Sequence, residues 1–169
     1  GLRGAQQLAN AAAALAALDA IKGRLPVDMQ SVRRGLIELE LAGRFQLVPG
    51  KPAVVLDVAH NPQAVEVLAS NLGDMGFYAG THAVVGMLAD KDLAGALAAL
   101  KDRVTHWYLA GLDVPRGASS ATLAVVAERL GGTIACFDDV GSAFVAARKA
   151  AGENDRILAF GSFYTVAAV

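Results

Sequence analysis

The 169-residue sequence has one cysteine, few charged residues and no long apolar run, and each shortage excludes a class of protein. Cys136 cannot form an internal disulfide, so we expect a reduced core residue in a cytoplasmic protein. Charged residues make up 18% and hydrophobic residues 54%, which excludes intrinsic disorder. The densest apolar segment, residues 8–21, is too short to span a membrane. A net charge of −1 gives no reason to expect nucleic acid or an anionic membrane as a partner.

Three motifs of nucleotide and hydrolase chemistry are also missing. There is no Gly-x-x-x-x-Gly-Lys-Ser/Thr phosphate loop, no Gly-x-Gly-x-x-Gly fingerprint after the first strands and no Gly-x-Ser-x-Gly elbow. If this chain takes part in phosphoryl transfer, another domain must supply the phosphate loop and Mg²⁺. The chain begins at Gly1 without an initiator Met and stops at Val169 within an apolar segment, so we expect a piece of a longer protein.

From residue 45 onward, short apolar runs alternate with amphipathic stretches. The runs predict strands at residues 45–48, 54–59, 83–87, 107–111, 133–137 and 156–160. The stretches predict helices at residues 62–72, 91–103, 120–130 and 140–151 and from 164 to the end. The turn Pro49-Gly50-Lys51-Pro52 allows the first strand to pair antiparallel with the second. This pattern predicts an α/β, Rossmann-like three-layer fold, with a mixed sheet of about six mostly parallel strands and helices on both faces.

The first 42 residues follow a different pattern. Residues 7–22 are rich in Ala and Leu and predict one helix. Asp28 is expected to cap a second helix, in which Met29, Val32 and Leu36 recur at helical spacing. We therefore expect residues 1–42 to be a helical tail of a preceding domain, and residues 43–169 to form the α/β domain.

The second predicted strand ends in two groups that packing does not require. Asp57 is a carboxylate in an apolar strand, which is costly unless it is paired. His60 follows just before a helix for which Asn61 is the expected cap and Pro62 the first residue. Because ligands bind at the carboxyl ends of strands in open α/β sheets, Asp57 is predicted to belong to a site. Two possible metal ligands without a third do not predict a metal centre.

Three other strand ends carry polar or glycine residues that the topology would bring to the same edge. They are Asp90-Lys91-Asp92, Asp113-Val114-Pro115-Arg116-Gly117 and Gly161-Ser162-Phe163-Tyr164. Their convergence predicts a binding cleft, although helix capping by Asp90, Asp92 or Ser162 and an exposed turn at Arg116 are alternatives. His82 and His106 are interpreted as surface or edge residues.

Five ordered motifs together resemble the C-terminal part of bifunctional folylpolyglutamate synthase/dihydrofolate synthase, a family of the Mur ligase superfamily. The motifs are Gly43-Arg44-Phe45-Gln46, Leu56-Asp57-Val58-Ala59-His60-Asn61-Pro62, Gly86-Met87-Leu88-Ala89-Asp90-Lys91-Asp92, Pro115-Arg116-Gly117-Ala118 and Gly161-Ser162-Phe163-Tyr164-Thr165-Val166. Gln7-Leu8-Ala9-Asn10-Ala11-Ala12 also looks like the helix near the end of that family's central ATPase domain.

The resemblance implies an ATP-dependent amide ligase. ATP phosphorylates the carboxylate of dihydropteroate or of a folate, and the amino group of L-glutamate attacks the acyl phosphate. In such enzymes the phosphate loop, the magnesium ligands and a carbamylated lysine belong to the central domain. The C-terminal domain closes over the nucleotide and contributes the glutamate side of the cleft, so this chain alone is expected to be inactive.

The same resemblance implies roles for individual residues. It places Asn10 at the adenine end of ATP, Arg44 at the phosphates and Asp57 at the ribose or nearby groups, with His60 beside them. On the glutamate side it offers four candidates, namely Lys91, Asp92, Ser162 and Tyr164. Tyr164 stands where some relatives have a histidine.

Two other readings stay open at this point. One is a non-catalytic doubly wound module that binds a nucleotide, with a receiver-like domain as one version. A receiver needs an aspartate at the end of its third strand, and residues 107–111 provide none. The other is a purely structural closing domain that binds nothing alone.

Overall fold

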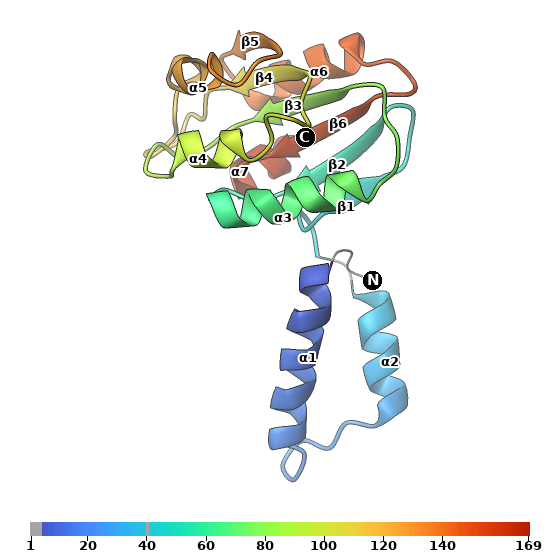
Figure 1. Cartoon of the computed structure of the whole chain (residues 1–169). Coiled ribbons are helices and arrows are strands. Elements are labelled where there is room, and N and C mark those ends of the chain that lie inside the picture. Colours follow the sequence, from blue (N-terminus) through green and yellow to red (C-terminus); the bar gives the residue numbers. More distant parts are fainter. Residues whose placement is uncertain (1–4, 40) are drawn as a thin grey trace.

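The computed structural model describes residues 5–39 and 41–169, in which two N-terminal helices precede an α/β domain (Figure 1). The first four residues and residue 40 of the predicted helical tail lie outside the described residues.

The α/β domain is built on one six-stranded sheet with the order β1-β2-β6-β3-β4-β5. β1 pairs antiparallel with β2, and all other neighbours are parallel, which confirms the predicted mixed sheet. The strands are β1 Gln46–Val48, β2 Ala53–Asp57, β3 Thr81–Val85, β4 His106–Ala110, β5 Thr133–Phe137 and β6 Arg156–Phe160. The last strand in sequence therefore lies in the middle of the sheet.

Helices cover both faces of the sheet, as predicted (Figure 1). α3, α4 and α5 pack in a row on one face, while α6 lies across β3, β4 and β6 on the other and α7 packs beside β6. Their bounds are α3 Pro62–Gly73, α4 Leu93–Ala98, α5 Ser120–Ala127, α6 Val140–Ala150 and α7 Phe163–Ala167.

Each of these five helices begins at a side-chain cap. The cap oxygen accepts a backbone N–H three residues later, which satisfies one of the free donors of the first turn. The cap residues are Asn61, Asp92, Ser119, Asp139 and Ser162. The predicted starts are therefore close to the observed ones.

The helix predicted at residues 91–103 is much shorter than expected. Asp92 caps it, so it starts at Leu93, and after Ala98 the N–H groups of Lys101 and Arg103 bond to carbonyls only three residues back. This tighter winding replaces the α-helix. It also allows Leu100 to become fully buried.

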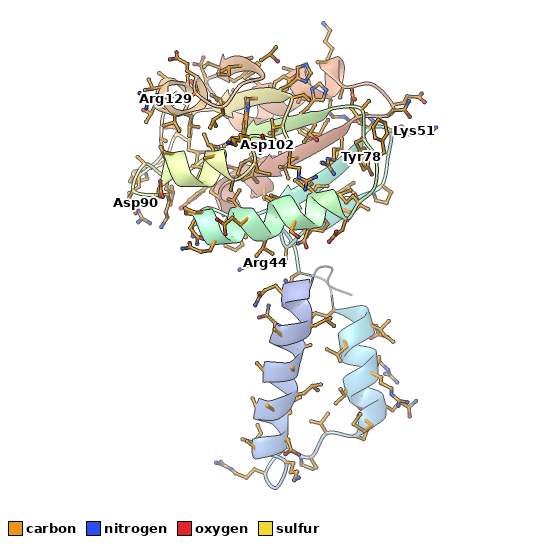
Figure 2. All side chains as sticks on the ribbon, viewed as in Figure 1. Arg44, Lys51, Tyr78, Asp90, Asp102 and Arg129 are labelled. Atoms are coloured by element: carbon orange, nitrogen blue, oxygen red, sulfur yellow. The ribbon has the colours of Figure 1, made fainter. Side chains whose placement is uncertain are left out.

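The helices α1 Ala5–Ala20 and α2 Met29–Glu38 stand apart from the sheet (Figure 1). Among the described residues, neither helix packs closely on the α/β domain, and α2 has no buried residue. Leu8, Met29 and Ile37 are 77%, 66% and 71% exposed, and Figure 2 shows side chains pointing outward all around both helices. None of the described helices has the length and hydropathy needed to cross a membrane.

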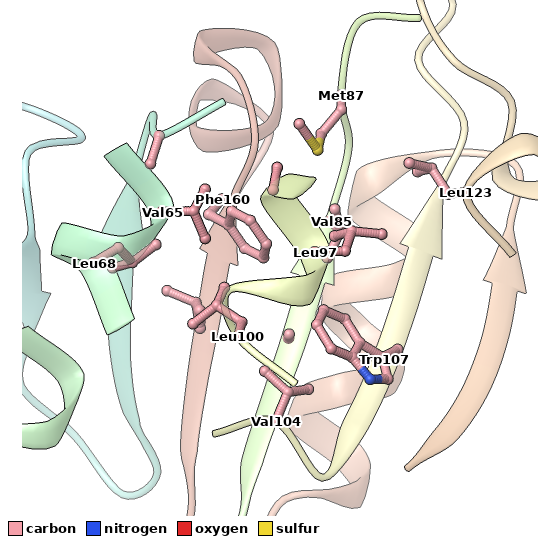
Figure 3. Close-up of a cluster of buried hydrophobic side chains, with 14 of the residues drawn as sticks. Val65, Leu68, Val85, Met87, Leu97, Leu100, Val104, Trp107, Leu123 and Phe160 are labelled. Carbon is pink, nitrogen blue, oxygen red and sulfur yellow. The ribbon is translucent and has the colours of Figure 1, made fainter. Parts of the chain in front are cut away.

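Two apolar layers hold the sheet between its helices. The larger layer packs β3, β4 and β6 against α3, α4 and α5, and Figure 3 shows Trp107 and Phe160 among leucines from those helices. The smaller layer lies under α6, where Ala143 and Ala147 have no exposed surface. Small side chains there let α6 approach the sheet closely.

Two expectations about single residues are wrong. His82 is only 2% exposed, because β3 is a central strand; its Nδ1 lies 3.0 Å from the Tyr108 hydroxyl, and its ring stacks on His106. Cys136 is exposed rather than part of the core, because it lies on β5, the strand at the edge of the sheet.

Truncation of one core side chain should be costly. Leu100→Ala is expected to lower the free energy of unfolding by about 2–5 kcal/mol, because Leu100 is fully buried in the larger layer and leaves a cavity. Val125→Ala, at a position 70% exposed on α5, should change it by less than about 0.5 kcal/mol. Urea unfolding of both variants measures the difference. Equal losses would mean that Leu100 is not a core residue.

Candidate functional site

The candidate site lies at the carboxyl ends of β2, β6 and β3. The register places Asp57 beside Phe160 and Phe160 beside Val85, so the residues that follow these strands meet at one level. β2 leads into α3 on one face, whereas β6 leads into α7, whose Val166 packs with the layer under α6. A change of face between neighbouring strands opens a crevice, and such crevices bind ligands in open α/β sheets.

Asp57 joins the two backbone segments that border this crevice. Its Oδ2 accepts the N–H of Phe45 at 2.8 Å, and its Oδ1 accepts the N–H of Ala59 at 2.7 Å. The costly carboxylate in the strand is therefore compensated by two backbone donors.

The turn that contains Arg44 is held in an unusual backbone conformation. Phe45 has φ +44° and Gly43 has φ +69°, a region that L-residues rarely adopt. A Cβ on Gly43 would stand 2.8 Å from Cγ1 of Val58, and the Gly43 carbonyl accepts the Val58 N–H, so only glycine fits this close approach. The turn buries Phe45 and leaves Arg44 exposed.

The electrostatics of this corner are set by burial and by Arg44. Burial raises the pKa of the Asp57 carboxyl above its ordinary 3.8, while the N–H groups of Phe45 and Ala59 and the nearby Arg44 charge oppose that rise. Arg44 forms no ion pair within residues 5–39 and 41–169. Its guanidinium lies at the rim of the crevice, on the side that faces the two N-terminal helices (Figure 2).

His60 follows β2 and is half-buried. Its Nδ1 lies 3.0 Å from the Val58 carbonyl oxygen, which can only accept, so Nδ1 carries a proton and in the neutral ring Nε2 is an acceptor. The described part of the chain holds no group of three His, Cys, Asp or Glu residues that could bind a metal ion.

The carbonyl oxygen of Gly86, just after β3, accepts two hydrogen bonds at the carboxyl ends of the strands. The hydroxyls of Ser162 and Thr165 both donate to it, at 3.1 and 2.6 Å, and Ser162 also caps α7. A Cβ on Gly161, which has φ +114°, would stand 2.6 Å from the same oxygen. Ser162 is buried and its hydroxyl is occupied, while Tyr164 is 54% exposed. Thr165 is not among the predicted site residues, although it lies three residues after Ser162, a residue type that favours helix caps.

The loops after β3 and β4 complete the rim. Leu88 pairs with Gly117, and Asp90 accepts a hydrogen bond from Arg116 at 2.9 Å across the same gap. This exposed pair joins the two predicted rim segments.

The start of α4 lies beside the start of α3. Asp92 caps α4, and a Cβ on Gly95 would collide with both Asp92 and Pro62. Lys91, half-buried, precedes the cap, so the two glutamate-side candidates Lys91 and Asp92 are near the His60 loop.

Asn10 is the one site candidate that lies outside the α/β domain. It is exposed on α1, and its amide donates to Gln7 at 3.1 Å. The described residues therefore bring Arg44, Asp57 and His60 together and leave Asn10 on a separate helix.

Comparisons with known proteins point to one family. Residues 43–163 match the family model described as Mur ligase, glutamate ligase domain. The chain is 46% identical over 160 residues to the Dihydrofolate synthase/folylpolyglutamate synthase of Escherichia coli strain K12, covering 95% of this chain. It spans only 36% of that relative's length.

Solved structures give the same result. The structure of E. coli FolC in complex with DHPP and ADP superposes with a TM-score of 0.84 at 46% identity, covering 94% of this chain and 37% of that one. A bifunctional folylpolyglutamate synthase/dihydrofolate synthase with Mn, AMPPNP and L-Glutamate bound gives a TM-score of 0.82 at 45% identity, covering 95% and 38%. The predicted fold class and the resemblance found in the sequence are both confirmed.

The raised pKa of Asp57 predicts a particular pH dependence of stability. The folded state binds the proton of the Asp57 carboxyl more tightly than the unfolded state does. The stabilisation that results is complete below pH 3.8 and is lost as pH rises through the raised pKa of Asp57. As pH rises over this range, the free energy of unfolding of the unchanged chain should fall relative to that of Asp57→Asn, which has no carboxyl at this position. Urea unfolding from about pH 3 to pH 7 measures the difference between the two chains.

Asp113→Asn, at an exposed carboxylate, is the matched control and should follow the unchanged chain. A stability difference that moves in the opposite direction would show that the N–H groups and Arg44 outweigh burial at Asp57.

Proposed function

The chain belongs to the Mur ligase family, and we propose that it is the C-terminal domain of an ATP-dependent amide ligase that adds L-glutamate to dihydropteroate or folate. The reaction runs through an acyl phosphate, which the glutamate amine attacks. The observation that carries this proposal is Arg44, an exposed cation that forms no ion pair with any described residue, on a turn anchored to Asp57 at the carboxyl ends of the strands.

Arg44 suits the phosphate end of ATP. Phosphoryl transfer spreads negative charge over the phosphate oxygens, and a guanidinium offers several N–H donors in a fixed plane. Because the turn is held by Asp57, by the Val58 N–H and by Gly43, the guanidinium is carried by a backbone that has little freedom to move. We assign Arg44 to the phosphates.

Asp57 and His60 suit the ribose side of the same nucleotide. Each Asp57 oxygen uses one lone pair on a backbone N–H and keeps another that can accept a ribose hydroxyl. The free Nε2 of His60 offers a further acceptor nearby. Asp57 thus has two tasks in this proposal, to hold the Arg44 turn and to bind the nucleotide.

Four residues are proposed for the glutamate side. The Lys91 ammonium would pair with a carboxylate of L-glutamate, and Asp92 has a second oxygen, Oδ2, free to accept from its amine. Tyr164 is exposed and can reach a substrate directly. Ser162 would act indirectly, since its hydroxyl fixes the start of α7 and so the position of Tyr164.

The metal and the rest of the cleft are assigned to another part of the protein. The relatives' structures contain Mn, ADP or AMPPNP, L-Glutamate and DHPP. The described residues of this chain do not offer a metal site, so we propose that Mg²⁺ and the phosphate loop belong to a preceding domain. The exposed apolar residues of α1 and α2 would pack on that domain, with residues 1–42 as its last segment and Asn10 near adenine. The reaction is proposed to be cytoplasmic.

The rival nucleotide-binding or receiver-like module gains no support from a specific observation. A receiver needs an aspartate at the end of its third strand, and residues 107–111 provide none. A purely structural closing domain would not need an exposed arginine on a strained turn.

The role of Arg44 is testable in the longer protein that contains this chain. Arg44→Ala should lower kcat for glutamate-dependent ADP release by about 100-fold, because charge stabilisation in the transition state is lost. The KM for L-glutamate should change little. Arg129→Ala, at an exposed arginine far from Arg44, is the control (Figure 2). If the two variants lose the same activity, Arg44 has no part in phosphoryl transfer.

The isolated chain should bind ATP weakly or not at all and should turn over nothing, because half of each site is missing. Calorimetric titration of the 169-residue chain with ATP and with L-glutamate tests this, and a Kd of about 1 mM or weaker is expected for both. Tight stoichiometric ATP binding, or phosphorylation of the chain itself, would contradict the ligase assignment.

A further inference from the structure

A pocket opens at the amino ends of β3 and β6, on the opposite side of the sheet from the carboxyl ends of the strands. It has a volume of about 300 Å³ and is lined by Tyr78, Thr81, Arg103 and Arg156, among others. Five-residue strands separate it from the Arg44 site by roughly 15 Å. Figure 2 shows Tyr78 and Asp90, one residue from each edge, on opposite sides of the domain.

Arg156 is a buried cation in this pocket, only 5% exposed. Its Nε donates to the Thr81 hydroxyl at 3.0 Å, its Nη1 donates to the Leu72 carbonyl at 2.6 Å, and its guanidinium lies 5.0 Å from the centre of the Tyr78 ring. No carboxylate of the described residues pairs with it. A buried charge held only by neutral groups is costly.

One nitrogen of Arg156 is free for a ligand. Nη2 makes no hydrogen bond to any described residue. Among these residues, every fully buried side-chain nitrogen and oxygen has a hydrogen-bond partner, so an atom without one is not fully buried. Nη2 is therefore open to the pocket rather than sealed in the core.

Arg103 brings a second guanidinium to the same pocket. It lies over Gly73, with Nη2 only 2.9 Å from the place where a Cβ would stand, and it forms no ion pair with the described residues. Burial lowers the pKa of Arg156, and the charge of Arg103 lowers it further, although Tyr78 opposes this. The two cations are thus close enough to repel each other.

Nearby carboxylates do not neutralise the pair. Asp102 lines the pocket but is exposed and forms no ion pair with a described residue. Asp155 accepts the Gly152 N–H and faces His82 Nε2 at 3.4 Å.

We propose that this pocket binds a phosphate-type oxyanion between Arg156 and Arg103. Two guanidinium groups offer several N–H donors to a tetrahedral oxyanion and would lose their mutual repulsion when it binds. Phe77, which is 92% exposed and lines the same pocket, would cover an organic substituent. The source is therefore free phosphate or a phosphate monoester. The site is independent of the nucleotide edge and of the ligase assignment.

The test is a titration of the ¹⁵N-labelled 169-residue chain with inorganic phosphate at constant ionic strength. Saturable shifts are expected for the amides of residues 76–81 and for the Nε–H signals of Arg103 and Arg156. Arg103→Gln should weaken binding by about tenfold, since one charged donor group is lost. Its side chain is exposed, so the fold should persist, whereas Arg156 also holds Leu72 and Thr81.

A control variant separates this pocket from other cationic positions. Arg129→Gln should leave the shifts and the affinity unchanged, because Arg129 is exposed and does not line the pocket. Shifts that do not saturate, that chloride reproduces, or that persist at full strength in Arg103→Gln would overturn the proposal. The arginines would then only complement the carbonyl end of α3.

Phenyl phosphate in a parallel titration distinguishes the two sources. Tighter binding than inorganic phosphate, reversed by Phe77→Ala, identifies a monoester ligand. Equal affinity identifies the free ion. Both results support an oxyanion site, whereas binding of acetate as strongly as of phosphate would contradict the phosphate assignment.

Discussion

The carboxylate of Asp57 is the constraint on which the candidate site depends. Its two oxygens bind the N–H groups of Phe45 and Ala59, which belong to segments on either side of the β1–β2 hairpin. Without this clamp, only the Gly43–Val58 hydrogen bond and the burial of Phe45 would oppose the strain of its positive φ, and the Arg44 turn would be held less firmly. Burial disfavours the charged form of Asp57, and yet the Asp57 carboxyl holds the turn that carries Arg44.

The two edges of the sheet use arginine in different ways. Arg44 is exposed and carried by a rigid turn, as suits a charge that must meet a ligand held by another domain. Arg156 is buried and held by a carbonyl, a hydroxyl and an aromatic ring. Both lack a carboxylate ion pair within the described residues. In Arg44 the backbone is held, whereas in Arg156 the guanidinium itself is held.

Most of the fold could be predicted because its signals are local. Capping residues such as Asn61 and Asp139 mark helix starts, and short apolar runs mark strands, so five of the helices begin where capping places them. Two errors concern properties that depend on strand order: His82 is buried because β3 is central, and Cys136 is exposed because β5 is at the edge. A third concerns length, because the helix predicted at residues 91–103 ends at Ala98. Within the site, the sequence placed Asp57 at a strand end and the Ala59 N–H two residues further on is a local donor, but the Phe45 N–H, from a residue 12 positions earlier, comes from tertiary structure.

The central position of β6 has a consequence for biosynthesis. β6 separates the β1–β2 hairpin from β3, β4 and β5, and it follows all five of these strands in sequence. Until residues 156–160 have been synthesised, the hairpin and the group of β3, β4 and β5 have no strand between them, and each has an open inner edge that could pair wrongly. Truncation just before residue 156 would therefore yield an aggregation-prone polypeptide, although five of the six strands would be present.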